Sequence, residues 1–255
     1  MIIDCFPFLN ELDLLELRLN ELSTLVDKFV ICEGTRTFSN KPKELVFPKN
    51  RDRFDGFSDR IEYVVLEDYS GIDVQRSWDM EKAQKQLAID VATKDIQVGD
   101  LLIFSDCDEI PRAEAIQANI GSEFTLAMLE MPLFYYYLNC RCISQIWRRC
   151  KLLRVPNNEK IYYTHVHCFS GDYRITNAGW HFSYLGDIEY KINSSTHTEF
   201  AKPPYNTPEY IEECVRECRD LFNRESFFHI EDDLSYLPKY VLENRDKFRQ
   251  HILEQ

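Results

Sequence analysis

The sequence contains no apolar run that approaches the roughly 18 residues that a membrane-spanning helix needs. Its first residues, Met1 to Asp4, lack the basic and apolar regions of a secretory signal peptide. Positive charge is also scarce, because 30 Lys and Arg stand against 43 Asp and Glu and give a net charge of −13. That balance argues against a protein that binds nucleic acid or an anionic membrane through clustered basic side chains. We therefore expect a soluble protein with no membrane span and no nucleic-acid partner.

Several common catalytic motifs are missing as well. The sequence has no G-x-S-x-G, Walker A, G-x-G-x-x-G or H-E-x-x-H pattern, and no internal repeat, low-complexity tract or flexible linker. Its 255 residues are 44% hydrophobic and 13% aromatic, which is enough for a buried core and argues against disorder.

The nine cysteines are odd in number and occur without a signal peptide, so we expect reduced thiols in a cytoplasmic protein. Most should act as small buried hydrophobic residues. Cys140 and Cys142, followed by Cys150, His165, His167 and Cys168, leave a zinc site as an alternative, although none of these spacings is the C-x-x-C of a zinc motif.

The N-terminal part of the chain alternates between apolar strands and amphipathic helices. We predict strands at 2–8, 28–32, 61–66 and 101–104. Asn10 can cap a first helix after the first strand, and a second helix is predicted at 77–93. This alternation is typical of a parallel sheet with covering helices. Such sheets bind ligands beyond the carboxyl ends of their strands.

The second half of the sequence is richer in short aromatic segments. We predict strands at 124–131, 134–138, 151–155, 161–167 and 179–185. Amphipathic helices are predicted at 208–224 and 239–253. The simplest interpretation is one α/β domain with a C-terminal helical appendage.

The sharpest chemical signal is Asp106-Cys107-Asp108, which directly follows the predicted strand at 101–104. In an extended chain the two carboxylates point to the same side and repel each other unless a cation lies between them. Oxygen ligands favour Mg²⁺ or Mn²⁺, which also bind substrate phosphates. We therefore favour a metal site here over a solvated acidic turn or a helix N-terminus.

Two basic segments could face a diphosphate. Glu33 could accept hydrogen bonds from ribose hydroxyls, and Arg36 and Lys41 follow it in the same loop. The second segment holds five basic residues and no acidic one: Arg141, Arg148, Arg149, Lys151 and Arg154. Either segment could instead be exposed and pair with acidic surface.

The last candidates lie in residues 178–199. They are two aromatic residues that could stack on a sugar, two carboxylates that could act as general base and two histidines that could bind a metal: Trp180, Tyr184, Asp187, Glu189, His197 and His181. A purely structural histidine is the alternative for each of the last two.

Several segments resemble one known family. They are the opening from Asp4 to Leu22, the segments 26–33, 36–38 and 41–43, Trp78 with Glu81, residues 106–111, and residues 178–183 with Lys191. In this order they are similar to the β-1,4-mannosyl-glycoprotein β-1,4-N-acetylglucosaminyltransferases, glycosyltransferase family 17. The matches extend over most of the chain and are more specific than the paired aspartates alone.

The resemblance implies a GT-A type α/β fold, with a central, mostly parallel sheet flanked by helices and with C-terminal helices. It implies an inverting transfer of N-acetylglucosamine from UDP-GlcNAc to a glycan hydroxyl, with Mn²⁺ or Mg²⁺ as cofactor. The catalytic domain would span 1–200, with a nucleotide-binding half at 1–112 and an acceptor half at 113–200, and the appendage would span 201–255. A start at the first strand resembles a bacterial or viral relative that acts in the cytoplasm of a bacterium or of an infected host cell.

The resemblance also suggests roles for single residues. Asp106 and Asp108 would hold the metal. By the layout of inverting GT-A enzymes, His197 would be a late metal ligand with His181 in reserve, and Asp187 would be the base with Glu189 in reserve. The donor would contact eight residues: Phe8, Glu33, Arg36, Lys41, Trp78, Asp106, Trp180 and His181.

Two other functions stay open at this point. A metal-dependent phosphohydrolase could use the same acidic strand end, but the sequence lacks the further Asp and His clusters of a two-metal site. A non-catalytic carbohydrate-binding module could use Trp78, Trp147, Trp180 and the tyrosines. That function would leave the acidic strand end and the basic loop after Glu33 without an explanation.

Overall fold

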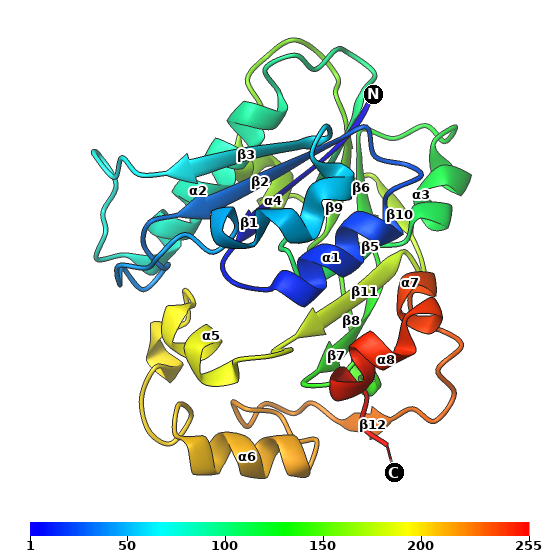
Figure 1. Cartoon of the computed structure of the whole chain (residues 1–255). Coiled ribbons are helices and arrows are strands. Elements are labelled where there is room, and N and C mark those ends of the chain that lie inside the picture. The colour runs from blue at the N-terminus through cyan, green and yellow to red at the C-terminus, as the bar shows by residue number, and fades with distance from the viewer. Residues whose placement is uncertain (255) are drawn as a thin grey trace.

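The four apolar segments of the N-terminal half form adjacent parallel strands in the computed structural model, which describes residues 1–254. These strands are β1 (Ile2–Phe8), β2 (Lys28–Gly34), β3 (Ile61–Leu66) and β4 (Leu101–Phe104), in the order β3-β2-β1-β4 (Figure 1). β1 and β2 are buried along nearly their whole length, because helices cover both faces of the sheet. The predicted α/β class with a mostly parallel sheet is confirmed.

Helices cover the two faces of this sheet. α1 (Leu12–Glu21), the 3₁₀ helix η1 (Pro48–Phe57) and α3 (Ala113–Asn119) share one hydrophobic cluster with the strands. α2 (Ser77–Ala92) and α4 (Tyr163–Cys168) share a second cluster on the other face. Each large apolar side chain buried in these clusters stabilises the fold by roughly 1.5–3 kcal/mol relative to its exposed state.

Three further strands extend the sheet beyond β4. β9 (Lys151–Arg154) pairs antiparallel with β4, β6 (Leu126–Leu129) pairs antiparallel with β9, and β10 (Tyr173–Ile175) lies parallel to β6 at the edge. The complete sheet has seven strands in the order β10-β6-β9-β4-β1-β2-β3. Among these seven strands, β9 runs against the rest.

A second sheet lies next to the first and has five strands in the order β12-β8-β7-β11-β5. They are β5 (Glu109–Pro111), β7 (Met131–Tyr135), β8 (Cys140–Trp147), β11 (Gly179–Ser183) and β12 (Phe228–Ile230). Because β5 follows β4 almost directly, the chain passes from the first sheet to the second at residues 105–108.

Helices from distant parts of the chain cover the second sheet. α1 packs on one face together with α7 (Lys239–Glu243) and α8 (Arg245–Phe248), which precede a short 3₁₀ helix. α5 (Ile188–Ser194) and α6 (Pro208–Arg216) pack on the other face. The C-terminal segment is therefore part of the second layer, and β12 within it pairs with β8.

Gly179 allows β11 to approach β5 closely. A Cβ atom at this position would lie 2.2 Å from the carbonyl oxygen of Ile110 and 2.8 Å from the Cα of Pro111. Its φ of 150° is also one that side chains of L-residues rarely adopt. Glycine is therefore required where the two strands meet.

Some predicted elements differ from the structure. Residues 161–167 were expected to form a strand but contain most of α4, because Tyr163 and Val166 lie one helical turn apart and pack on the first sheet. The first helix begins at Leu12 with Glu11, not Asn10, as its N-cap. The helix expected at 208–224 ends at Arg216, and the one at 239–253 is broken into short pieces. β8 was not predicted.

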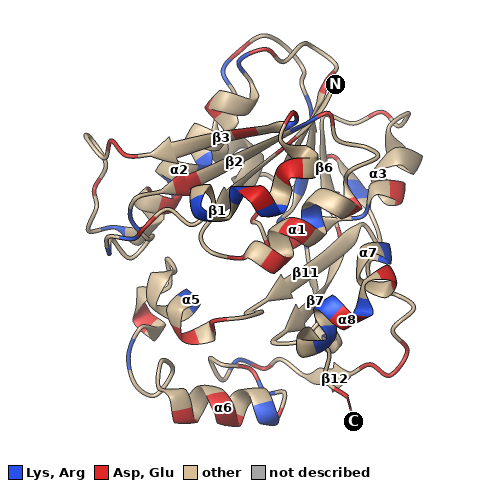
Figure 2. Cartoon of the chain, in the orientation of Figure 1, with Lys and Arg blue, Asp and Glu red and all other residues tan. Residues whose placement is uncertain are grey.

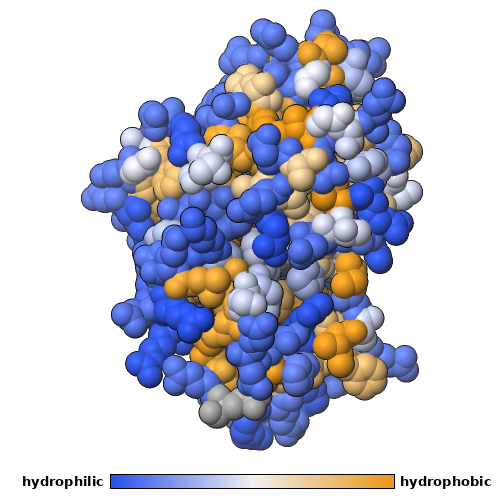
Figure 3. All heavy atoms as spheres, turned by 90° about the vertical axis from the view of Figure 1, so that its right-hand side faces the viewer, coloured by the Kyte–Doolittle hydropathy of each residue, from blue (hydrophilic) through white to orange (hydrophobic). Residues whose placement is uncertain are grey.

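Acidic and basic residues are interspersed over the elements of both sheets, so neither layer carries one sign alone (Figure 2). On the face shown in Figure 3, apolar side chains gather in patches between hydrophilic ones. No helix within residues 1–254 has the length and apolar character that a bilayer crossing requires.

Candidate active site

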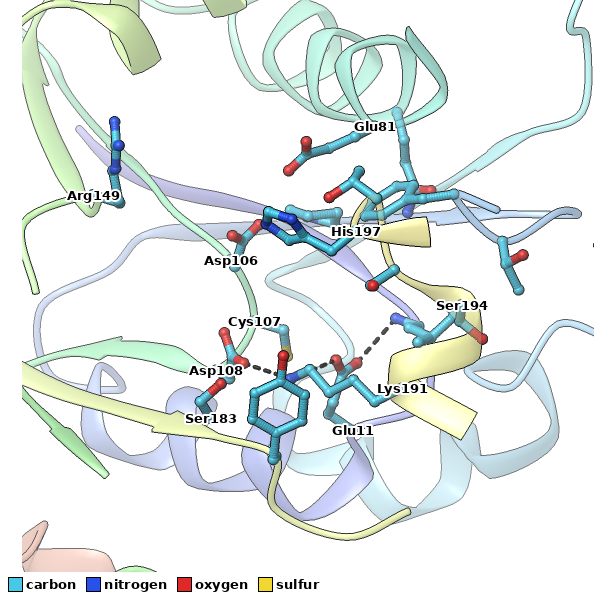
Figure 4. A pocket seen from close by; sticks show the side chains of 18 of the residues that line it. Glu11, Glu81, Asp106, Cys107, Asp108, Arg149, Ser183, Lys191, Ser194 and His197 are labelled. Atoms are coloured by element: carbon cyan, nitrogen blue, oxygen red, sulfur yellow. Dashed lines mark hydrogen bonds and ion pairs between the residues drawn. The ribbon is translucent and has the colours of Figure 1, made fainter. Parts of the chain in front are cut away.

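A pocket of about 440 Å³ opens at the carboxyl ends of β1, β2 and β4 (Figure 4). β1 leads through α1 to β2 on one side, and β3 leads through α2 to β4 on the other, so the strand order reverses between β1 and β4. Open α/β sheets bind their ligands at this kind of switch point. The ends of the parallel strands β7 and β11 contribute the opposite wall with Tyr135 and Ser183.

The segment with the paired aspartates forms a turn rather than the expected extended chain. The backbone N–H of Glu109 donates to the carbonyl oxygen of Asp106 at 3.1 Å. As a result the two carboxylates diverge, Asp106 toward Glu81 and Asp108 toward Lys191 (Figure 4). The expectation that they converge on one point is wrong for this structure.

Arg18 on α1 stabilises this turn through hydrogen bonds. Its Nη1 donates to the carbonyl oxygens of Asp106 at 2.8 Å and Glu109 at 2.7 Å, and its Nη2 donates to the hydroxyl of Ser105 at 2.8 Å. Nε and Nη2 also donate to the two carboxylate oxygens of Asp4 at 2.7 Å and 2.6 Å. Both side chains of this ion pair are fully buried. Each of the five guanidinium N–H groups thus has an acceptor.

Lys85 on α2 neutralises Asp106. Its Nζ lies 2.6 Å from Asp106 Oδ1 and 2.7 Å from Glu81 Oε1. Burial alone would lower the pKa of Lys85, but the two carboxylates outweigh burial and raise it well above its ordinary value. Asp106 keeps 40% of its side chain exposed, so it is the accessible carboxylate of the pair Asp106 and Asp108.

Lys191 on α5 neutralises Asp108. Its Nζ lies 2.5 Å from Asp108 Oδ2 and 3.7 Å from Glu11 Oε1, while His181 Nε2 lies 3.5 Å from Asp108 Oδ1. Burial works to raise the pKa of Asp108, but Lys191 and then His181 hold it far below its ordinary range. Asp108 is therefore an ionised and weakly basic group, with its negative charge balanced by the lysine.

Glu109 follows Asp108 in the chain, and its side chain is buried. Trp147 Nε1 donates to its Oε1 at 2.5 Å, and Trp147 also packs against the ring of His181 at 4.3 Å between centroids. Burial, assisted by the charge of Asp106, raises the pKa of Glu109 to about 7. His181 Nδ1 is buried and has no hydrogen-bond partner among the residues that the structure describes.

The lining of the pocket is more basic than the chain as a whole. Its charged side chains are six basic and four acidic ones: Arg36, Lys43, Lys85, Arg149, Lys191, Arg224, Glu11, Glu81, Asp106 and Asp108. Within residues 1–254, Arg36 and Arg149 have no carboxylate partner in an ion pair, and Arg36 donates to Asn40. These two side chains leave positive charge available to an anionic ligand in a protein of net charge −13.

The structure brings most of the predicted site residues together. Those that line the pocket are Phe8, Arg36, Trp78, Asp106, Asp108, Arg149, His181, Tyr184 and His197. Trp78 and His197 lie edge to face at 5.1 Å, and His197 Nδ1 is 2.9 Å from Glu199. His167, which the sequence suggested only as part of the alternative zinc site, also lines the pocket. Burial and then Lys85 lower the pKa of His167 to about 4, so it is neutral at pH 7.

Glu33 and Lys41 do not line the pocket. Both carboxylate oxygens of Glu33 are occupied by protein donors, because Lys43 and the backbone N–H of Val46 bind one and Tyr63 and the backbone N–H of Phe47 bind the other. Glu33 is thus the internal anchor of the loop that follows β2. Lys43, rather than Lys41, is the lysine of this loop that reaches the pocket wall.

Three further predicted residues lie away from the pocket. Trp180 is 1% exposed, donates from Nε1 to the carbonyl oxygen of Tyr236 at 2.9 Å and has Arg112 over its ring at 4.0 Å, so in this conformation it is not open to a sugar. Asp187 caps α5 by accepting from the backbone N–H of Tyr190 at 2.9 Å, and Glu189 is exposed in the same turn. Neither carboxylate is placed to act as the base that we expected.

The described residues contain no group of three or more His, Cys, Asp or Glu side chains placed to hold a metal ion. The described residues therefore do not enclose a cation with protein ligands alone. His197 contacts Glu199 and Trp78. Mg²⁺ is usually bound through one or two carboxylates together with substrate phosphates. The exposed carboxylate of Asp106 on a basic pocket wall fits that second arrangement.

The chain is similar in sequence to known proteins. The model of a protein family described as glycosyltransferase family 17 matches residues 1–253. The chain is also 26% identical over 120 residues to a rat β-1,4-mannosyl-glycoprotein 4-β-N-acetylglucosaminyltransferase, and 27% identical over 112 residues to the human protein of that name. These alignments cover 45% and 42% of this chain but 22% and 21% of the relatives. The matched part is thus about a fifth of the relatives' length.

Proposed function

The chain belongs to glycosyltransferase family 17, and from this premise we propose that it transfers N-acetylglucosamine from UDP-GlcNAc to a glycan hydroxyl with inversion at the anomeric carbon. The observation that carries the proposal is the basic pocket at the switch point between β1 and β4, with the Asp106 turn on its wall. A nucleotide sugar has the matching chemistry, since its diphosphate is anionic and the rest of the molecule is neutral.

We further propose that the fold is of the GT-A type. The order β3-β2-β1-β4 is that of a doubly wound nucleotide-binding half, and the adjoining second sheet supplies the opposite wall of the pocket. In this arrangement the nucleoside would lie against the ends of β1 and β2, near Phe8 and Gly34. A Cβ atom at Gly34 would lie 2.9 Å from the carbonyl oxygen of Arg36, so the wall is tightly packed there.

The residues around Asp106 would assist the departure of the diphosphate. Arg36 and Arg149 lack carboxylate partners among the described residues and can donate to phosphate oxygens. Mn²⁺ or Mg²⁺, held by Asp106 together with the diphosphate, would withdraw charge from the leaving group. Lys85 is within reach of Asp106 and fixes its carboxylate on the pocket wall. Arginines, lysine and carboxylate would thus place the donor.

Calorimetric titration of UDP-GlcNAc, first with Mn²⁺ and then with excess chelator, tests the proposal. We expect binding that requires the metal and that weakens at least about tenfold in Asp106→Asn, because the carboxylate charge is lost. Asp232→Asn is the matched control, since Asp232 is exposed and does not line the pocket. No binding of UDP-GlcNAc under either condition, or unchanged binding and turnover in Asp106→Asn, would contradict the proposal.

A further inference from the structure

The pocket has a second end that the donor site does not account for. It is formed by Tyr135 at the end of β7, Tyr184 just after β11, and Phe200, Phe222 and Arg224 from the C-terminal part of the chain. Phe200 and Phe222 are stacked at 4.0 Å between centroids, and the ring of Tyr184 lies 5.8 Å from that of Phe222. This end therefore has an aromatic wall, while the end near Asp106 is lined by charges.

A series of contacts between side chains links the Asp106 turn to the aromatic end of the pocket. Lys191, which binds Asp108, lies with its Nζ 5.8 Å from the centre of the Tyr184 ring. The ring of Tyr184 lies 5.2 Å from that of Tyr135, and the hydroxyl of Tyr135 is bound by Arg224. Arg224 is thus reached from Asp108 through Lys191 and two tyrosine rings, on the wall made by the second sheet.

The guanidinium of Arg224 is held in place through Nε and Nη2, which in the described part of the chain leaves Nη1 free to donate to a ligand. Its Nε and Nη2 bind the two carboxylate oxygens of Asp220 at 3.0 Å and 2.6 Å, and Nη2 also donates to the hydroxyl of Tyr135 at 2.5 Å. Asp220 is buried, so the guanidinium is held rigidly. Nη1 has no acceptor among the residues that the structure describes, and Arg224 lines the pocket.

Two tyrosine hydroxyls add further donors. The hydroxyl of Tyr135 accepts from Arg224, and within residues 1–254 its own proton has no acceptor. Burial raises the pKa of Tyr135 to about 12, so this proton is present at neutral pH. The hydroxyl of Tyr184 has no hydrogen-bond partner in the described part of the chain, although the residue lines the pocket. Tyr184 also has a φ of 57°, a left-handed conformation that costs on the order of 1 kcal/mol.

The charge at this end indicates what kind of ligand it fits. Asp220 cancels the charge of Arg224, whereas the described residues give Arg36 and Arg149 at the other end no carboxylate partner. A neutralised arginine and two phenols are suited to neutral oxygen atoms rather than to phosphate. The aromatic faces next to them suit the apolar face of a sugar ring.

We propose that Tyr135, Tyr184 and Arg224, with the stacked pair Phe200 and Phe222, form the acceptor subsite, and that it takes an uncharged saccharide. This assignment rests on the proposed function for its meaning, because an acceptor subsite exists only in a transferase. The donors would bind ring hydroxyl or acetamido oxygens of the acceptor and would leave the sugar next to Lys191 and Asp108. The C-terminal part of the chain would then determine acceptor specificity.

The test compares two variants, Arg224→Gln and Tyr184→Phe, in two binding measurements. Saccharide binding is measured by saturation-transfer NMR with a panel of uncharged disaccharides (chitobiose, mannobiose and lactose) and with sialyllactose as the anionic probe. Donor binding is measured by calorimetry with UDP-GlcNAc and Mn²⁺. Arg219→Gln is the matched control, since Arg219 pairs with Glu213 and Glu217 on the surface and does not line the pocket.

We expect the wild type and Arg219→Gln to bind at least one uncharged disaccharide more tightly than sialyllactose. That binding should weaken about 3- to 10-fold in each of the two subsite variants, the usual effect of one hydrogen bond, while UDP-GlcNAc binding stays within about twofold. Tyr184→Phe removes a single oxygen atom and keeps the ring, so it guards against a loss of folding.

The opposite results overturn the assignment. The assignment fails if the wild type binds no disaccharide of the panel or prefers sialyllactose. It also fails if neither variant changes saccharide binding, or if both variants lose UDP-GlcNAc binding. If UDP-GlcNAc fails to bind the wild type while the variants still weaken saccharide binding, the donor proposal fails and the saccharide site stands. The two proposals can therefore fail separately.

Discussion

Replacement of Arg18 by methionine would measure how far the fold depends on one buried guanidinium. Arg18 and Asp4 are both 0% exposed, and loss of one partner of a buried ion pair typically costs about 3–5 kcal/mol, because the other charge stays buried. The carbonyl oxygen of Glu109 would also lose its shorter hydrogen bond, from Arg18 at 2.7 Å, and keep the one from the Ser105 hydroxyl at 3.2 Å, a change that we set at about 1–3 kcal/mol. We therefore expect the free energy of unfolding to fall by about 4–8 kcal/mol, against a usual total of about 5–15 kcal/mol.

Urea denaturation followed by circular dichroism gives the measurement, and a second substitution separates the two causes. In Asp4→Leu combined with Arg18→Met the orphaned carboxylate is gone, so the double variant should be about 2–4 kcal/mol more stable than Arg18→Met alone. It should still be less stable than the wild type, because the carbonyl groups of Asp106 and Glu109 still lack the hydrogen bonds from Arg18. Exposed Arg51→Met is the control and should stay within about 0.5 kcal/mol of the wild type. A loss below about 1 kcal/mol in Arg18→Met, or no recovery in the double variant, would refute this reasoning.

Three further predictions concern the same region. Because the pKa of Glu109 is about 7 in the folded protein against an ordinary 4.5, its contribution to stability is complete below pH 4.5 and is lost as the pH rises through 7. Glu109→Gln should therefore reduce the fall in unfolding free energy between pH 4.5 and 8 by roughly 1–3 kcal/mol, and equal pH profiles would contradict this. Gly179→Ala should cost about 2 kcal/mol or more in urea denaturation because its Cβ has no room, whereas Gly121→Ala, with no atom within 4 Å of the new Cβ, should not be destabilising. Lys85→Met leaves Asp106 and Glu81 without a counter-ion and should lower the free energy of unfolding by about 3 kcal/mol in urea denaturation. A change near zero would show that these ion pairs do not form.

The parallel sheet could be predicted from the sequence because its signals are local. The segments 2–8, 61–66 and 101–104 are short, mostly apolar and separated by helix-length stretches, and the structure gives them the same bounds. The position of Asp106 and Asp108 at the ligand edge follows from the same pattern. The sequence pattern therefore indicated the edge of the first sheet at which the pocket lies.

The conformation of the Asp106 turn was not predictable in this way, because it depends on residues far away in the chain. Arg18 is 88 residues before Asp106 and Lys191 is 83 residues after Asp108, and no spacing in the sequence links them. One signal was present for Arg18, since it stands between Leu17 and Leu19 in an apolar helix, where an arginine must be buried with a partner or must disrupt the packing. The lysines that neutralise the two aspartates left no comparable trace.

The error at Trp180 has a geometric cause that also shows what the sequence leaves undecided. Successive side chains of a strand point to opposite faces, so Trp180 and His181 on β11 cannot both face the pocket. The pattern of apolar residues does not choose between them, because β11 is buried along its whole length and both faces are covered. The choice follows from pairing with β5, where Trp180 stands opposite Ile110, in the cluster under α7, and His181 stands opposite Glu109. The pairing depends in turn on the close approach at Gly179, so the face that reaches the ligand is determined by contacts between strands that lie about 70 residues apart.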